Sequence, residues 1–319
     1  MEDKVIFKVR ILKNRKRLPI VGVLLSALLI AASIAGCSNT PGTTTTPPAT
    51  TDQGVGVLKP ETHLKVATTS SLYDTGLWAL LEPMFEKQNN CQVDILYANT
   101  GLAMTYGQRG DVDVIAVHDK TKELQFITDG YGTQRYVFAY NYFVIVGPAN
   151  DPLGLKGLSP EEAFKKLAAS KTTPFVSRGD TSGTYSKELA IWKAAGLDYQ
   201  TVRNSGSWYV EAGQGMGPTL AIAGQKQAYT LSDIGTFLAY KAQTGLVSLV
   251  DTGSILLNVY SVIPINPAKV NINNSQAELA SKFAQWMVSP DIQKIIGEYG
   301  VKDYSRSLFT PCAGNEPTA

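Results

Sequence analysis

Three short segments place hydroxyl side chains and glycines between a predicted strand and a predicted helix. They are residues 67–71 (ATTSS), 177–184 (SRGDTSGT) and 213–217 (GQGMG). Helix N-termini present backbone N–H groups without partners and a partial positive charge, and Ser and Thr hydroxyls add donors without adding a full charge. Arg178 adds a planar guanidinium that suits an oxyanion. Together these residue types predict a site that binds an anion.

Each segment also has an ordinary structural interpretation. Ser, Thr and Asp are common N-caps, and any one of the three segments taken alone is better explained as a cap. Arg178 can pair with Asp180 or another acid as well as bind a ligand. The second segment favours a ligand most strongly, because a guanidinium, two hydroxyls and a glycine stand within seven residues, at Arg178, Ser182, Gly183 and Thr184.

The elements that must position these segments form an alternating pattern. Short β-branched runs alternate with longer helical stretches, which predicts an α/β fold with mostly parallel sheets. We expect strands at 64–67, 93–97, 113–117, 142–146, 175–176 and 259–265, and helices at 76–88, 161–170, 184–195, 217–224, 232–244 and 277–287. A folded length of about 250 residues favours two lobes over one.

The first 62 residues have the features of an export signal followed by a tether. Seven basic residues fall within the first 17 positions, an uncharged apolar segment follows at 18–36, and small residues precede Cys37. This order predicts a lipoprotein signal peptide at 1–37, whose lipobox Cys37 becomes the lipid-bearing first residue; an uncleaved membrane anchor is the alternative. Residues 38–62, rich in Thr and Pro, are expected to form a tether. Either way the folded part is expected outside the cytoplasm and attached to a membrane.

Charge and histidine content exclude other classes. The whole chain has a formal net charge of +2, but beyond residue 17 there are 22 basic and 25 acidic residues. No basic field remains to hold nucleic acid, so no nucleic-acid partner is expected. His63 and His118 are too few for a histidine metal cage, and no metal cation is expected. His118 is expected to be a surface or internally satisfied side chain.

Seven sequence motifs follow one another along the chain. They are ATTSSLYDTGLW at 67–78, GDVDVIAVHD at 110–119, YNYFVIVGPANDP at 140–152, FVSRGDTSGT at 175–184, SWYVEAGQGMGPTLAIA at 207–223, AYTLSDIGTF at 228–237 and NVYSVIPINP at 258–267. On these motifs the chain from about residue 64 to 289 resembles the TupA-type tungstate receptors of ABC transporters, a branch of the two-lobed oxyanion receptors.

The resemblance implies a periplasmic-binding-protein type II-like fold. Two α/β lobes would each carry a mostly parallel or mixed sheet with helices on both faces, and the ligand cleft would lie between the lobes. We expect lobe one at 63–143 and 262–310, lobe two at 144–261, and a tail at 311–319. The two extended crossings between the lobes are expected at 142–147 and 259–264.

The resemblance also implies a function without catalysis or cofactor. A monomeric receptor on the extracytoplasmic face would close over one tetrahedral oxyanion, tungstate or its closest rival molybdate, and deliver it to the permease and ATPase subunits of an importer. The ligand-binding residues implied are Thr68, Thr69, Ser70, Ser71, Thr100, Arg178, Ser182, Gly183, Thr184, Gly215 and Met216. The sequence departs from the family where Ile234 stands in place of a usual Arg and Tyr142 in place of a usual Asp.

Other interpretations remain open from the sequence. Tungstate, molybdate and sulfate are fully ionised dianions that need only donors, whereas hydrogen phosphate also needs an acceptor, which Asp180 or Asp74 could provide. A phosphate- or sulfate-type receptor is therefore the alternative. The Asp-Thr-Gly sequences at 74–76 and 251–253 resemble aspartic peptidase loops, but the chain is too helical for a double β-barrel. A disulfide between Cys91 and Cys312 is a further hypothesis for an exported protein.

Overall fold

Two β-sheets that share one long strand organise residues 62–318, the part of the chain that the computed structural model describes. The first sheet has the order β2 (Cys91–Ala98), β1 (Thr62–Thr69), β3 (Val114–Val117), β9 (Leu257–Pro264) and β4 (Tyr136–Gly147). The second continues from β4 to β7 (Tyr229–Asp233), β5 (Phe175–Ser177) and β6 (Tyr209–Glu211). Two short strands, β8 (Val247–Val250) and β10 (Thr310–Pro311), also pair with β4.

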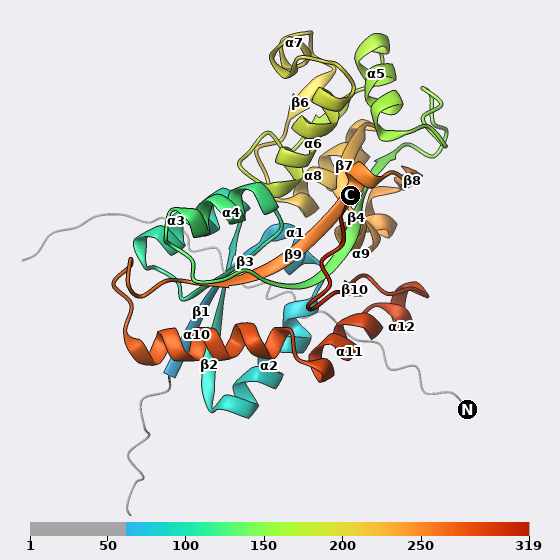
Figure 1. The fold of residues 1–319 in the computed structure, drawn as a ribbon. Helices are drawn as coiled ribbons and strands as arrows, with labels where there is room; N and C mark the ends of the chain where they lie inside the picture. The colour runs from blue at the N-terminus through green and yellow to red at the C-terminus, as the bar shows by residue number, and fades with distance from the viewer. Residues whose placement is uncertain (1–61, 319) are drawn as a thin grey trace, which may run out of the picture. The chain divides into compact units, whose positions relative to one another are not determined.

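Both sheets contain parallel and antiparallel strand pairs, and β4 passes from the first sheet to the second between two consecutive residues. In the first sheet β1 runs parallel to β2 and β3, while β9 is antiparallel to β3 and β4; in the second β5 is parallel to β6 and β7, and β4 is antiparallel to β7. Tyr142 of β4 still pairs with Leu257, whereas Phe143 pairs with Asp233. Figure 1 shows β4 and β9 passing between the elements of the first sheet and those of the second.

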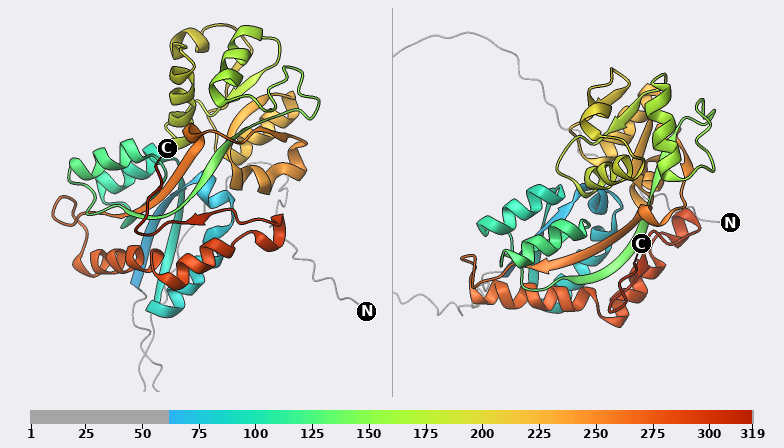
Figure 2. Two further views of the ribbon diagram at one scale, coloured as in Figure 1. Left: turned by 45° about the vertical axis from the view of Figure 1, so that its right-hand side comes forward. Right: turned by 45° about the horizontal axis from the view of Figure 1, so that its top comes forward.

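Helices cover both faces of each sheet. On the first sheet, α2 and α10 pack on one face and α3 and α4 on the other, as Figure 2 shows. On the second, α5 and α6 lie on one face and α8 and α9 on the other. The helices are α1 (Ser70–Asp74), α2 (Leu77–Asn89), α3 (Thr100–Arg109), α4 (Lys120–Thr128), α5 (Pro160–Ser170), α6 (Gly183–Ala194), α7 (Tyr199–Arg203), α8 (Met216–Lys226), α9 (Ile234–Thr244), α10 (Asn274–Met287), α11 (Pro290–Glu298), α12 (Val301–Tyr304) and the 3-10 turn η1 (Ser254–Leu256).

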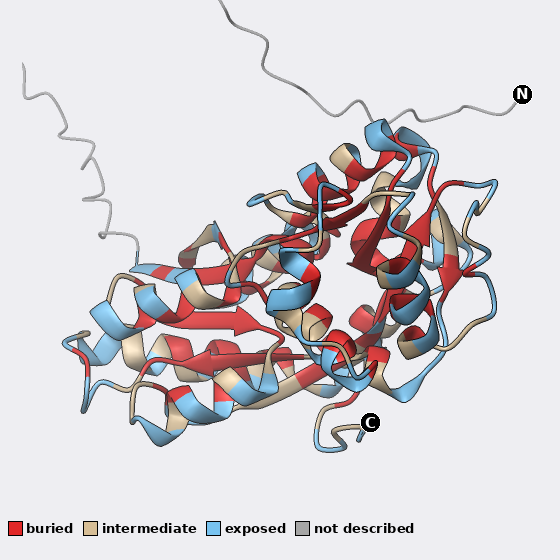
Figure 3. Cartoon of the chain, turned by 90° about the horizontal axis from the view of Figure 1, so that it is seen from above, coloured by how far each residue is buried: buried red, intermediate tan, exposed pale blue. Residues whose placement is uncertain are grey.

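The burial of the strands explains why their sequences are continuous apolar runs. All four residues of β3 are buried, as expected for a strand covered on both faces. Figure 3 shows buried residues along the strands and exposed residues on the outer sides of the helices. The predicted fold class, an α/β fold with mixed sheets and helices on both faces, is confirmed.

Each predicted element overlaps an observed one, and three of the differences in extent are informative. The strand expected at 142–146 is the second half of β4, and the strand expected at 259–265 begins earlier, at Leu257. The helix expected at 232–244 begins only at Ile234, because Ser232 and Asp233 end β7. Asp233 then caps α9 by accepting the Thr236 N–H at 2.9 Å.

The hypothesis of a Cys91–Cys312 disulfide is wrong: no disulfide joins these two buried residues. Cys91 begins β2 at one edge of the first sheet, and Cys312 follows β10, which pairs with β4 at the far end of that sheet. Strands lie roughly 4.8 Å apart, so five strand spacings separate the two residues by about 20 Å or more, whereas a disulfide needs Cα atoms closer than about 7 Å.

The predictions for the N-terminus fall on residues that the structure does not describe. The signal peptide (1–37), the lipidated Cys37 and all of the tether (38–62) except its last residue lie outside residues 62–318. Within the described range, none of the helices combines the length and the apolar character needed to cross a bilayer.

Candidate anion-binding site

Ser70 is the point where the three predicted segments meet. Its Oγ accepts from Nη1 of Arg178 at 3.3 Å and from the backbone N–H of Met216 at 3.4 Å. Ser70 begins α1 directly after β1, Arg178 follows β5, and Met216 begins α8. Segments more than 100 residues apart in the chain therefore form one site, built at strand ends and helix starts.

The residues around Ser70 are buried and ordered by short-range contacts. Thr69 caps α1, and its Oγ1 accepts the Leu72 N–H at 3.4 Å. Thr68 Oγ1 accepts from the indole Nε1 of Trp78 at 2.8 Å. The indole only donates, so the Thr68 hydroxyl proton is still available to an acceptor.

The hydroxyl of Ser71, a predicted ligand residue, contacts His118. Its Oγ lies 2.9 Å from Nε2 of His118, and Nδ1 of His118 lies 2.9 Å from Oδ1 of Asn258. An amide oxygen only accepts, so Nδ1 carries the proton and Nε2 accepts from the Ser71 hydroxyl. Burial lowers the pKa of His118 to about 4, which keeps the ring neutral. The Ser71 hydroxyl is held by His118 in this structure.

Arg178 is held in place by Asp180. The guanidinium is 3% exposed, and its Nη2 lies 2.5 Å from Oδ2 of Asp180. Oδ1 of Asp180 accepts the Ser182 N–H at 3.1 Å. Both carboxylate oxygens of Asp180 therefore already accept from protein donors, and Nε of Arg178 has no partner among the described residues.

Two buried hydroxyls share this lack of a partner. Thr100 begins α3 and Thr184 is the second residue of α6; both are 0–1% exposed, and neither Oγ1 has a hydrogen-bond partner within residues 62–318. A buried donor without a partner costs roughly 1–3 kcal/mol, and most buried donors have one. Three such donors, counting Nε of Arg178, belong to predicted ligand residues. A tetrahedral oxyanion, which offers acceptors on every side, fits this set.

Backbone contacts bring the first of these hydroxyls to the second segment. The N–H of Gly101, next to Thr100, donates to the carbonyl of Thr181 at 3.2 Å, and Thr181 Oγ1 donates to Oδ1 of Asn99 at 2.9 Å. Lys122 Nζ reaches the same carbonyl at 3.2 Å. The start of α3 therefore lies against the loop that carries Arg178.

The remaining predicted residues pack closely at the same place. Ser182 caps α6, its Oγ accepting the Tyr185 N–H at 3.1 Å. A Cβ added to Gly183 would lie 2.9 Å from Cε1 of His118, and one added to Gly215 would lie 2.3 Å from Oη of Tyr97. Real Cβ contacts are essentially never this short, so a side chain at Gly183 would displace the buried His118, whereas one at Gly215 would displace the end of the exposed Tyr97 side chain.

Glu188 supports the loop that carries Arg178, although no sequence pattern indicates this role. Its carboxylate accepts from Ser177 Oγ at 2.6 Å and from Tyr209 Oη at 2.5 Å, and also from Nε1 of Trp192. Complete burial raises the pKa of Glu188 to about 7. Since Ser177 directly precedes Arg178, this buried cluster fixes the end of β5.

The two departures from the resembled family have local explanations. Ile234 is 7% exposed and packs in the apolar cluster that includes Met216 and Phe237, so it supplies no charge to the site. Tyr142 is 42% exposed and stacks edge-on against Tyr140, with 6.0 Å between ring centroids.

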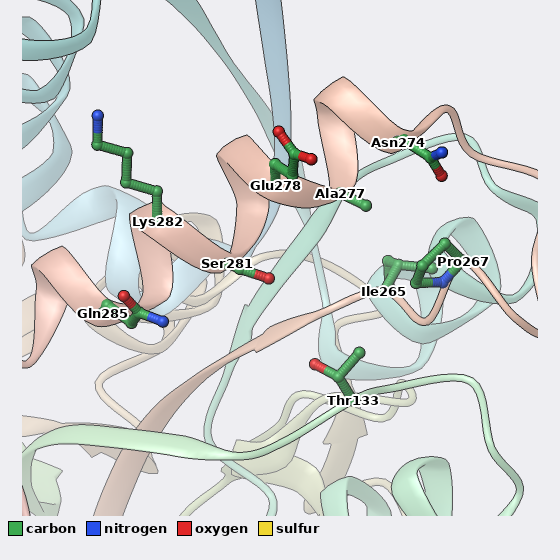
Figure 4. Close-up of a pocket in the computed structure, with 9 residues that line it drawn as sticks. All are labelled: Thr133, Ile265, Pro267, Asn274, Ala277, Glu278, Ser281, Lys282 and Gln285. Atoms are coloured by element: carbon green, nitrogen blue, oxygen red, sulfur yellow. The ribbon is translucent and has the colours of Figure 1, made fainter.

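Of two hollows in the structure, one adjoins this site and the other does not. A cavity of about 670 Å³ adjoins it, since His118 and Gly183 are among its lining residues, together with Lys120, Lys122 and Lys187. Another hollow, of about 450 Å³, lies between α10 and the segment after β9 (Figure 4). None of the nine residues that line the second hollow is a predicted ligand residue.

Two mixed sheets joined by shared strands, with a donor-lined site at their strand ends, define the class of two-lobed periplasmic-binding-protein folds. A family model described as a PBP superfamily domain matches residues 42–291. The chain belongs to the PBP superfamily and, within it, to the family of the TupA proteins.

Individual relatives are similar to this chain over most of their length. The chain is 39% identical to the tungstate-binding protein TupA of Peptoclostridium acidaminophilum over 298 residues, which covers 92% of this chain and 98% of that protein. The crystal structure of the tungstate ABC transporter from Geobacter sulfurreducens is similar, with a TM-score of 0.67 and 46% identity over 74% of this chain and 98% of that one. TupA from Desulfovibrio alaskensis G20 has a TM-score of 0.66 and 40% identity over 79% and 99%. The predicted family resemblance is confirmed.

Proposed function

We propose that this protein is the extracytoplasmic receptor of an ABC importer and binds one tetrahedral oxyanion, tungstate or molybdate, between its lobes. The observation that carries the proposal is the set of buried, unpartnered donors on Thr100, Thr184 and Arg178, the last of which is hydrogen-bonded to Ser70. Charge-assisted hydrogen bonds contribute roughly 1.5–3 kcal/mol each, and six to eight of them, less the cost of association, give binding near −12 kcal/mol, or about nanomolar.

The lobes and the partners belong to the same proposal. Lobe one comprises 63–143 and 262–310, lobe two 144–261, and the tail 311–319; the change of pairing in β4 between Tyr142 and Phe143 supports the first boundary. Because β9 pairs within the first sheet from Leu257 onwards, this pairing favours a return crossing at 251–256 over the expected 259–264, which would move residues 257–261 from lobe two to lobe one. The closed, ligand-bound form, presented by a monomer anchored through Cys37, is the state that the permease and ATPase subunits would recognise.

A purely binding role is also proposed in place of an enzymatic one. Asp74 ends α1 at the site, whereas Asp251 is exposed after β8, and no hydrogen bond between them is found in the described part of the chain. Ser182 caps a helix, and His118 faces Ser71, which is 1% exposed. Neither arrangement presents a reactive oxygen to a substrate.

Calorimetry with tungstate, molybdate, sulfate and phosphate tests the ligand class. We expect tungstate and molybdate to bind in the nanomolar range, and phosphate at least about 1000-fold more weakly, because both oxygens of Asp180 and Oδ2 of Asp74 already accept from protein donors, which disfavours their taking the phosphate proton as well. If phosphate displaces tungstate at comparable concentration, the ligand assignment is wrong.

The substitution Gly101→Ala tests whether binding requires the two segments to close together. An added Cβ would lie 2.5 Å from Oγ1 and 2.6 Å from Cβ of Thr181. Alanine favours the helix by up to about 1 kcal/mol, so the free energy of unfolding without ligand should rise slightly while the affinity for tungstate falls about tenfold. The double variant Gly101→Ala with Thr181→Gly removes the clash and should restore affinity. An unchanged affinity in the single variant would argue against closure at this contact.

A further inference from the structure

Helix α8 lacks a cap of its own. Its N-cap residue is Gly215, which has no side chain to accept a hydrogen bond, and Pro218 at the third helical position has no N–H. The N–H groups of Met216 and Gly217 are therefore the donors of the first turn that need acceptors. The next N–H, from Thr219, already donates to the carbonyl of Gly215 at 3.0 Å.

Helix α1, from the opposite sheet, supplies both acceptors. Ser70 Oγ accepts the Met216 N–H at 3.4 Å, and Oδ2 of Asp74 accepts the Gly217 N–H at 3.3 Å. Tyr97 Oη donates to the same Asp74 oxygen at 3.5 Å. The cap of α8 is thus provided across the site, and it exists only when α1 and α8 are in contact.

Asp74 is placed where a bound dianion would oppose its charge. Ser70 and Met216, which face each other at the predicted ligand position, each lie within one helical turn of the Asp74–Gly217 contact. A charged carboxylate would repel the anion, whereas a protonated carboxyl keeps a carbonyl oxygen for the Gly217 N–H and loses the repulsion.

We propose that Asp74 is a closure residue whose carboxyl takes up a proton when the site closes on its oxyanion, so that binding strengthens as pH falls. This inference rests on the proposed function and identifies a regulation of the same site.

The groups facing Asp74 support the direction of the effect. They are Tyr97 from β2, Arg178 after β5, Asp233 from β7 and Tyr240 from α9. Burial raises the pKa of Asp74 from its ordinary 3.8 to about 6, although the contacts with Gly217, Tyr97 and Arg178 oppose the rise.

The sign of the pH dependence follows from this raised pKa. The closed form binds the proton more tightly than a solvated carboxyl does, so lowering the pH through about 6 towards 3.8 favours the closed form. A bound dianion beside Asp74 raises the pKa further and moves the effect towards neutral pH.

Calorimetry of tungstate binding between about pH 6.5 and 8.5, in two buffers of different ionisation enthalpy, measures the protons taken up. We expect the wild type to take up as much as one proton per tungstate bound, with affinity falling by at most about tenfold per unit of pH. Asp74→Asn keeps an acceptor for the Gly217 N–H but cannot titrate, so it should take up no proton and show a flat pH profile. Asp129→Asn, an exposed carboxylate at the end of α4, should behave as the wild type.

The number of protons that the wild type takes up on binding tests the inference even if a variant fails to fold. No proton uptake by the wild type, or the same uptake by wild type and Asp74→Asn, overturns the inference while leaving the receptor function intact. If the wild type binds no tungstate at all, the proposed function fails and the inference fails with it.

Discussion

Replacing Arg178 with Ala is expected to lower the affinity for tungstate by about three orders of magnitude. The guanidinium is the only cationic side chain bonded to Ser70 among the described residues, and its removal deletes charge-assisted bonds to the ligand worth roughly 1.5–3 kcal/mol each. It also leaves Asp180, whose side chain is 14% exposed, without its counter-ion and next to the bound anion. Two such bonds to the ligand, together worth about 4 kcal/mol, correspond to a factor of about 1000 in affinity.

Calorimetry on Arg178→Ala, with circular dichroism as a check on folding, measures this loss. Arg203→Ala is the matched control, because Arg203 also pairs with an acid in the same lobe, Glu211, but its side chain is 47% exposed. Exposed ion pairs contribute little to stability or to a distant site, so the affinity of this variant should stay within about twofold of the wild type. A folded Arg178→Ala variant that keeps its affinity within tenfold would remove Arg178 from the site.

Local sequence patterns are enough to predict the strands that are covered on both faces and the helices that begin at strong N-caps. The run at 113–117 is apolar because both faces of β3 are covered, and α5 begins at a capping box formed by Ser159 and Glu162 with Pro160 in its first turn. Helix α3 was not predicted, since its sequence TGLAMTYGQR contains two glycines and two threonines of low helix propensity. It forms because Asn99 caps it and its buried face packs on the first sheet.

The three candidate segments of the anion site were predictable because each carries its own signal, hydroxyls or glycines at a helix start. The residues that orient them were not. His118 binds Asn258 across 140 positions, and Glu188 reaches Tyr209 from a different element; each reads locally as an ordinary helix or strand-end residue. In the sequence Asp74 stands out as part of an Asp-Thr-Gly sequence and as a possible acceptor for a phosphate proton, but its partner Gly217 is 143 positions away. Such contacts depend on the packing of the two sheets, which no local pattern specifies.

The double substitution Thr100→Val with Thr184→Val separates a ligand role from a structural one. Valine keeps the shape of threonine and removes only the hydroxyl, which has no partner in the described chain at either position. Without ligand, the free energy of unfolding should therefore be unchanged or higher. With ligand, each lost donor should weaken tungstate binding about tenfold, or about 100-fold for both, since a hydrogen bond to a charged group contributes roughly 1.5 kcal/mol or more.

Thr230→Val is the matched control for this double variant. Thr230 is also buried, but its Oγ1 donates to the carbonyl of Val176 at 2.6 Å. Chemical denaturation should show a loss of about 1 kcal/mol in this control, and calorimetry should show unchanged affinity for tungstate. If the double variant instead loses stability and keeps its affinity, the two hydroxyls serve the fold and not the anion. Because the two roles change stability and affinity in opposite patterns, one pair of measurements distinguishes them.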